Sequence, residues 1–212
     1  MKHAVFFHVA TMNDYQRIVD ETFTLMSSSG IMKTSERIFV GIAGDGPLAL
    51  PAKVETAARF GLGEFEFPTL KLLRNHARQN LDHALLYIHT KGVSTPGNPC
   101  IEDWRKYMLH FLVTRYSQCL DVLSVSDTCG VDLRPLPVSH YSGNFWWTKA
   151  SHVSMLPDFE TMPTILSERH KAEFWVCSKG DKHHSLWDCG IGVNERHLHL
   201  YPSIKYQEAS CL

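Results

Sequence analysis

The run from His83 to Gly92, with the sequence HALLYIHTKG, constrains the fold of this chain most. Residues 84–88 form a short apolar stretch rich in aromatic and branched side chains, which is typical of a central strand in an α/β sheet. The polar residues His89, Thr90 and Lys91 follow at its carboxyl end, where open α/β sheets bind their ligands. A lysine followed by glycine suits an anionic ligand such as a phosphate, whereas the plain alternative is a strand that ends in a polar loop.

The first hundred residues are expected to alternate between strands and helices. The apolar patterns predict strands at 3–11, 37–43, 63–67 and 84–88, and helices at 13–26, 52–60 and from Pro68 to about Ala77. Asn13 is the expected N-cap of the first helix, and Pro68 suits the first turn of the third helix because its missing N–H costs nothing there. This alternation indicates a mostly parallel sheet flanked by helices.

The second half is expected to be less regular. A breaker-rich loop at 92–99 precedes one long helix at 102–124, a strand at 128–133, and short helices near 162–174. Ser142, Gly143 and Asn144 form a small-residue turn that enters a short aromatic strand. Irregular segments of this kind usually carry the specificity loops of an α/β domain.

Composition narrows the class of protein. With 212 residues and 44% apolar composition, the chain can bury the core of a single domain. The formal net charge of -1 and the lack of a basic run argue against nucleic acid as a partner. No apolar run approaches the roughly 20 residues of a membrane span. Six cysteines without a CxxC pair favour a reduced, cytoplasmic protein. Since no clear closing element precedes Leu212, the chain is compatible with a fragment of a longer one.

Several common enzyme motifs are missing from the sequence. It has no GxGxxG after the first strand and no GxxxxGK[ST], so neither a dinucleotide-binding fingerprint nor a P-loop is present. HExxH and GxSxG are also missing, which argues against zincin peptidases and α/β-hydrolases.

Three motifs in the same order resemble a known group of enzymes. They are YIHTKGV at 87–93, WRKYM at 104–108 and SGNFWW at 142–147. Together they are similar to bacterial and viral glycosyltransferases of the GT-A type, including chlorella virus enzymes thought to glycosylate the major capsid protein. The resemblance covers nearly the whole chain.

This resemblance implies one GT-A-like catalytic domain over residues 1–212. Its sheet would be mixed and mostly parallel, with a nucleotide-sugar-binding half at 1–100 and an acceptor-binding half at 101–212. The implied reaction moves a hexose or deoxyhexose from a UDP-sugar to a glycan or glycoprotein acceptor, commonly with bound Mn²⁺ or Mg²⁺. A viral source would place the protein in the host cell cytoplasm.

The metal site departs from the family pattern. GT-A enzymes usually end the equivalent strand in Asp-x-Asp, whose carboxylates hold a divalent cation on the diphosphate. Here the matching residues are His89, Thr90 and Lys91. The imidazole of His89 can ligate Mn²⁺, and His199 on an expected late strand is a second candidate. Lys91 would instead neutralise a phosphate directly and so contribute to catalysis.

Two groups of binding residues are expected, the first from the resemblance at residues 9–11 and otherwise from nearness to the expected strand ends. The nucleotide sugar is expected to contact Val9, Ala10, Thr11, Thr69, Arg74, His89, Thr90, Lys91 and Gly92. The sugar or acceptor is expected to contact Arg105, Ser142, Gly143, Asn144 and Trp146. The alternatives are a capped strand end at Thr11, a solvated helix face at Arg74, and a core position for one of the paired tryptophans.

Inversion at the sugar carbon requires a carboxylate base that deprotonates the acceptor. We expect Asp188 in that role, with Glu173, Asp158 and Asp103 as further candidates. Retention of configuration needs no such base, and the residues do not decide between the two outcomes.

Two other function classes stay open. A nucleotidyltransferase would need clustered carboxylates for two metals, which the expected strand ends lack. A catalytically inactive sugar- or nucleotide-binding module would use its tryptophans to stack on sugars. Binding of a free glycan without any affinity for nucleotides would favour the module.

Overall fold

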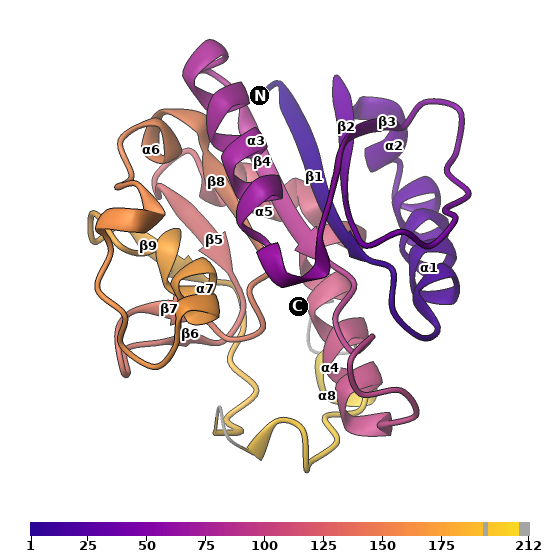
Figure 1. Cartoon of the computed structure of the whole chain (residues 1–212). Coiled ribbons are helices and arrows are strands. Elements are labelled where there is room, and N and C mark those ends of the chain that lie inside the picture. The colour runs from indigo at the N-terminus through magenta and orange to yellow at the C-terminus, as the bar shows by residue number, and fades with distance from the viewer. Residues whose placement is uncertain (193–194, 208–212) are drawn as a thin grey trace.

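The computed structural model describes residues 1–192 and 195–207 as an α/β fold built on a seven-stranded sheet (Figure 1). The strand order is β3-β2-β1-β4-β8-β5-β9. The strands are β1 (His3–Ala10), β2 (Arg37–Ala43), β3 (Glu55–Phe60), β4 (Ala84–His89), β5 (Thr128–Gly130), β8 (Trp146–Lys149) and β9 (His183–Ser185). The first four run parallel, whereas β8 pairs antiparallel with both β4 and β5. The predicted mixed, mostly parallel sheet is therefore confirmed.

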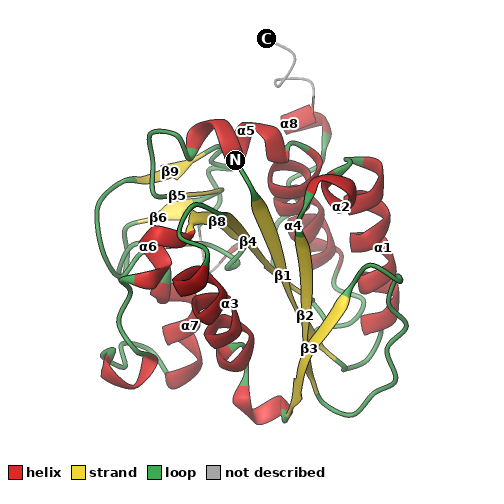
Figure 2. Ribbon diagram, turned by 90° about the horizontal axis from the view of Figure 1, so that it is seen from above, coloured by secondary structure: helices red, strands yellow, loops and turns green. Residues whose placement is uncertain are grey.

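Helices cover both faces of this sheet (Figure 2). One face is covered by α1 (Tyr15–Ser28), α2 (Ile31–Thr34), α4 (Pro99–Leu109), α5 (Tyr116–Val122) and α8 (Ile204–Gln207). The other is covered by α3 (Phe67–Gln79), α6 (Ala150–Ser154) and α7 (Lys171–Trp175). A small second sheet joins β6 (Leu133–Arg134) to β7 (His140–Tyr141).

The side-chain period of β1 explains why the core is split in two. Val5, Phe7 and Val9 join the cluster under α1 and α4, while Ala4 and Phe6 join the cluster under α3. Successive residues of a strand point to opposite faces, so a strand apolar at every position is buried on both sides.

Three expected elements differ in the structure. Residues 55–60, expected to be helical, form the edge strand β3, because pairing with β2 outweighs their helix propensity. Residues 62–64 form a 3₁₀ turn instead of a strand. The long helix expected at 102–124 is interrupted by a π-helical segment, His110–Thr114, where the indole N–H of Trp147 donates to the Leu112 carbonyl.

The expected N-cap also differs. Asp14 precedes α1, and its side chain makes no capping hydrogen bond to the helix backbone. Asn13 adopts a positive φ of 47° and its side-chain N–H donates to the Val93 carbonyl at 2.5 Å. Asn13 therefore ties the loop after β1 to the loop after β4 and does not cap the helix.

Two further expectations concern the whole chain. Among the described residues, no helix has the length and apolar character needed to cross a membrane. Five cysteines, Cys100, Cys119, Cys129, Cys177 and Cys189, are free thiols. Cys211 lies outside the described residues.

Candidate functional site

A cavity of about 510 Å³ opens where β1, β2 and β4 end. Its polar lining comprises His8, Glu66, His89, Thr90, Lys91, Ser94, Arg169 and Glu173. The predicted strand-end residues thus meet groups from the turn before α3 and from the α7 region, far away in the sequence. The cavity lies at the carboxyl edge of the parallel strands, where α/β folds bind ligands.

Two histidines lie side by side on the cavity floor. His8 of β1 and His89 of β4 are register partners in the parallel ladder. The Nδ1 atom of His8 is 2.9 Å from the Thr69 hydroxyl, which has room to approach because Gly41 carries no side chain. His89 donates from Nε2 to the Gly143 carbonyl at 3.0 Å, because that oxygen can only accept.

Burial keeps both imidazoles neutral. Desolvation lowers the pKa of His8 to about 4 and that of His89 to about 3. The positive charge of Lys91 lowers the pKa of His89 further. At neutral pH the two rings therefore offer hydrogen bonds without adding positive charge.

Lys91 is the cation at the end of β4. Its ammonium lies 3.9 Å from the centre of the Trp104 ring, a cation–π contact. Burial lowers the pKa of Lys91, while the carboxylates of Glu173 and Glu66 oppose that effect. Lys91 is thus partly desolvated and available to an anion that enters the cavity.

The loop that carries Lys91 is held in place by a buried arginine. Arg105 donates to the Lys91 carbonyl at 3.0 Å and pairs with Glu21 at 3.1 Å. Gly92 adopts a φ of 97°, and a Cβ there would lie 2.9 Å from Ile101. The structure therefore gives Arg105, expected at the acceptor, a positioning role behind Lys91.

The turn at 142–144 is tied to the cavity through Glu66. Asn144 donates to the Glu66 carboxylate at 2.5 Å and accepts the indole N–H of Trp146 at 2.8 Å. Tyr87 also donates to Glu66, at 2.9 Å, and its ring stacks on Trp146. Asn144 therefore holds the Glu66 carboxylate and Trp146 orients Asn144; both are buried and neither lines the cavity.

Other expected nucleotide-binding residues serve the scaffold. Val9 is fully buried in the core, and Thr69 is bonded to His8. The Thr11 hydroxyl donates to the Ala43 carbonyl at 3.0 Å and accepts the Gly46 N–H at 3.1 Å. Arg74 pairs with Asp158 and donates to the Leu156 carbonyl at 2.5 Å. Ala10, Thr90 and Gly92 do line the cavity, although the Thr90 hydroxyl accepts the Ala10 N–H at 3.0 Å.

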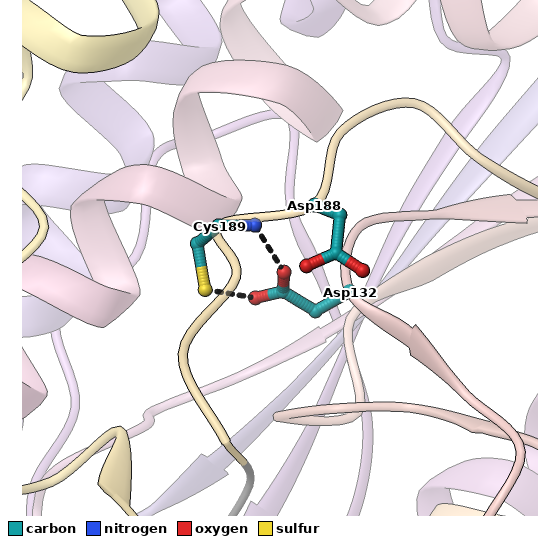
Figure 3. A group of neighbouring side chains, drawn as sticks. All are labelled: Asp132, Asp188 and Cys189. Carbon is teal, nitrogen blue, oxygen red and sulfur yellow. Dashed lines mark hydrogen bonds between the residues drawn. The ribbon is translucent and has the colours of Figure 1, made fainter.

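Asp188, the expected base, lies in another cluster (Figure 3). It is grouped with Asp132 and Cys189, whose backbone N–H donates to Asp132 at 2.8 Å. Arg134 pairs with Asp188 at 2.9 Å and with Asp132 at 3.4 Å, so a guanidinium already balances these carboxylates. The structure does not bring Asp188 to the cavity lining.

Possible metal ligands gather outside the cavity. Within residues 1–192 and 195–207, the three metal-ligand side chains that lie close together are Asp132, Asp188 and Cys189, and none of them lines the cavity. His199 is exposed on a hydrogen-bonded turn that replaces the expected strand. His89 lines the cavity and His199 does not, so their joint role in metal binding stays a prediction.

Three residues that line the cavity were not predicted from the sequence, and a fourth was predicted only as an alternative base. His8, Glu66 and Arg169 were not expected, whereas Glu173 was an alternative base. The register of His8 with His89 would have identified His8 once β1 and β4 were known to be neighbours. No local sequence pattern places Arg169 and Glu173 in the site, because the segment between β8 and α7 lacks long regular elements.

The buried His8 makes stability dependent on pH. A histidine whose pKa is lower in the folded state binds protons more readily when unfolded, so acid favours unfolding. We expect the unfolding free energy to fall as pH drops from 6.5 towards 4, by up to about 1.4 kcal/mol per pH unit for His8. The His8→Asn variant, which retains a partner for Thr69, should show a smaller drop in urea titrations at pH 7 and pH 5. An unchanged drop would contradict the neutral state of His8.

Gly143 is expected to tolerate no side chain. Its φ is 93°, and a Cβ would lie 2.6 Å from the Met108 sulfur and 3.1 Å from the Trp104 ring. Gly143→Ala should therefore lower the unfolding free energy by about 1–3 kcal/mol, measured by urea unfolding. Gly97→Ala is the matched control, since Gly97 has a φ of 75° but open space around it. If both variants lose the same unfolding free energy, the loss comes from the positive φ alone and not from contact with Met108 and Trp104.

Residues 4–162 match the sequence model of a protein family described as a domain of unknown function (DUF8361). No curated protein matches the chain. Among solved structures, a crystal structure of 4-diphosphocytidyl-2C-methyl-D-erythritol synthase aligns over 100% of this chain and 97% of its own. The identity is 11% and the TM-score is 0.34, a likeness too low to carry an argument.

Proposed function

The chain belongs to the DUF8361 family, and we propose that it is a transferase that moves a sugar from a nucleoside-diphosphate sugar to a hydroxyl acceptor. The observation that carries this proposal is the cavity at the ends of β1, β2 and β4. There Lys91 and Arg169 share one space with the carboxylates of Glu66 and Glu173. Two cations suit a departing diphosphate, and a nearby carboxylate suits deprotonation of an acceptor.

Lys91 and Arg169 are the proposed diphosphate ligands. Glycosyl transfer leaves negative charge on the departing diphosphate, and fixed cations stabilise that charge in the transition state. Lys91 is held over Trp104 and its carbonyl is fixed by Arg105, so it needs little reorganisation. Arg169 is exposed at the cavity wall and can form paired hydrogen bonds with phosphate oxygens.

Glu173 is the proposed base, in place of Asp188. It is half-buried on α7 and lines the cavity, and its charge acts on both Lys91 and His89. In an inverting transfer Glu173 would accept the proton of the acceptor hydroxyl while the bond from the sugar carbon to the diphosphate breaks. Glu66, held by Asn144 and Tyr87, is placed to bind a sugar hydroxyl.

The apolar rim supports a ring-shaped ligand. Leu62 and Phe65 line the cavity and are each 43% exposed. Phe65 can stack on a base or a sugar ring. The donor is proposed to be a UDP-sugar carrying a hexose or deoxyhexose, and the acceptor a glycan or glycoprotein such as a viral capsid protein. These finer assignments are supported by the motif resemblance alone.

Metal dependence stays a prediction. Because the group of three metal-ligand side chains among the described residues lies elsewhere, we propose that any Mn²⁺ or Mg²⁺ would be held largely by the diphosphate itself, with Glu66 or Glu173 as nearby carboxylates.

The direct test is consumption of a donor. We expect the purified protein to release UDP from at least one UDP-sugar, measured by chromatography of the nucleotides. A protein that consumes no sugar nucleotide and binds none, but binds a free glycan, would contradict the proposal and favour a sugar-binding module.

A further inference from the structure

Arg196 is a buried cation without a hydrogen-bond acceptor. Its side chain is 1% exposed, and Nε and both terminal nitrogens lack a partner among the described residues. The nearest carboxylate oxygen belongs to Asp103 and is 3.8 Å from the guanidinium, too far for a hydrogen bond. That oxygen instead accepts the Tyr201 N–H at 2.6 Å.

Aromatic rings surround this guanidinium. Its central carbon lies 5.0 Å from the centre of the Tyr107 ring, 5.6 Å from Tyr201 and 5.7 Å from Trp104. Cation–π contacts offset part of the charge but accept none of the five N–H bonds that an arginine directs in its plane. Its neighbours in 195–200 are exposed, so Arg196 is the buried residue of that stretch.

Two more hydrogen-bond donors are found at the Trp104 side chain. The Nε1–H of Trp104 is also buried without a partner. The ammonium of Lys91, a residue that lines the cavity, lies 3.9 Å from the centre of the Trp104 ring. Burial chiefly, and the positive charge of Arg196 among smaller effects, lower the pKa of Lys91, so the two cations are within electrostatic reach.

We propose that Arg196, the Trp104 indole N–H and Lys91 form an oxyanion subsite beneath the cavity floor that takes a phosphate group. All three groups are N–H donors, and two of them carry a positive charge. An anion with several acceptor oxygens satisfies such a set, and phosphate has that chemistry. The phosphate is either free inorganic phosphate or part of the diphosphate of a nucleotide in the cavity. Only the second source rests on the proposed function.

The test compares thermal unfolding of the wild type and of Arg196→Met with inorganic phosphate, pyrophosphate or UDP. The wild-type Tm is expected to rise with the concentration of at least one of these anions. Arg196→Met should bind that anion roughly 10- to 100-fold more weakly, because a hydrogen-bonded charge is lost. Without ligand, its Tm should equal or exceed that of the wild type, because a buried charge without a hydrogen-bond acceptor is replaced by an apolar chain of similar length.

Arg78→Met is the matched control, since Arg78 is exposed on α3 and its loss changes the net charge equally. A response to phosphate as well as pyrophosphate identifies a free-phosphate subsite, and a response to pyrophosphate and UDP alone identifies the diphosphate. Either supports the subsite. An unchanged response in Arg196→Met, no response of the wild type to any of the three, or a lower ligand-free Tm in Arg196→Met would overturn it. Anion binding without turnover of sugar nucleotides would refute the proposed function and leave the subsite standing.

Discussion

Replacing Lys91 with methionine is expected to weaken UDP binding by about 10- to 100-fold, because a hydrogen bond to a charged group contributes about 1.5–3 kcal/mol. Methionine retains an apolar stem against Trp104 while it removes the ammonium, which lies 3.9 Å from the ring centre. The loss should therefore come from charge and not from packing. Calorimetric titration with UDP measures it.

Lys33→Met is the control for this variant, because Lys33 is an exposed lysine in α2. It should bind UDP as the wild type does. Equal affinities in Lys91→Met and the wild type would mean that the diphosphate does not contact the end of β4.

Replacing Glu173 with glutamine is expected to lower kcat by about 10²- to 10⁴-fold, which is the usual contribution of a general base. Glutamine has nearly the same shape and can still donate and accept hydrogen bonds, but it cannot take the acceptor proton. UDP affinity should stay within a few-fold of the wild type. Steady-state kinetics together with UDP titration separate the two effects.

Glu168→Gln provides the comparison, since Glu168 lies at the surface five residues earlier and pairs with Lys171. Its kcat should be unchanged. A wild-type kcat in Glu173→Gln would remove Glu173 as the base and would point to a reaction that retains configuration.

The sheet could be predicted from the sequence because its strands carry strong local patterns. The apolar runs of β1, β2 and β4 fix both their length and their burial, and helices between them require a parallel arrangement. The apolar run of β4 also allowed Lys91 to be predicted as a ligand-binding cation, because Lys91 follows the end of that central strand. By contrast, β3 is an edge strand whose residues favour a helix, so only its pairing with β2 reveals it.

The rest of the site could not be predicted because it depends on contacts between distant segments. Arg169 and Glu173 reach the cavity through an irregular path that folds over α3, and no local pattern encodes that path. Arg105 illustrates the opposite case. Its place beside the motif suggested a ligand contact, but the buried pairing with Glu21 and the Lys91 carbonyl makes it a support.

The cavity at the ends of β1, β2 and β4 is proposed to bind a nucleoside diphosphate. Calorimetric titration of the protein with UDP, GDP and CMP, each with and without Mn²⁺, tests this binding. We predict that UDP binds in preference to the other two nucleotides, and that Lys91→Met weakens this binding. If affinity requires Mn²⁺, the diphosphate must carry the metal into the cavity, and if it does not, Lys91 and Arg169 suffice. If none of the three nucleotides binds, the cavity is not a nucleoside-diphosphate site.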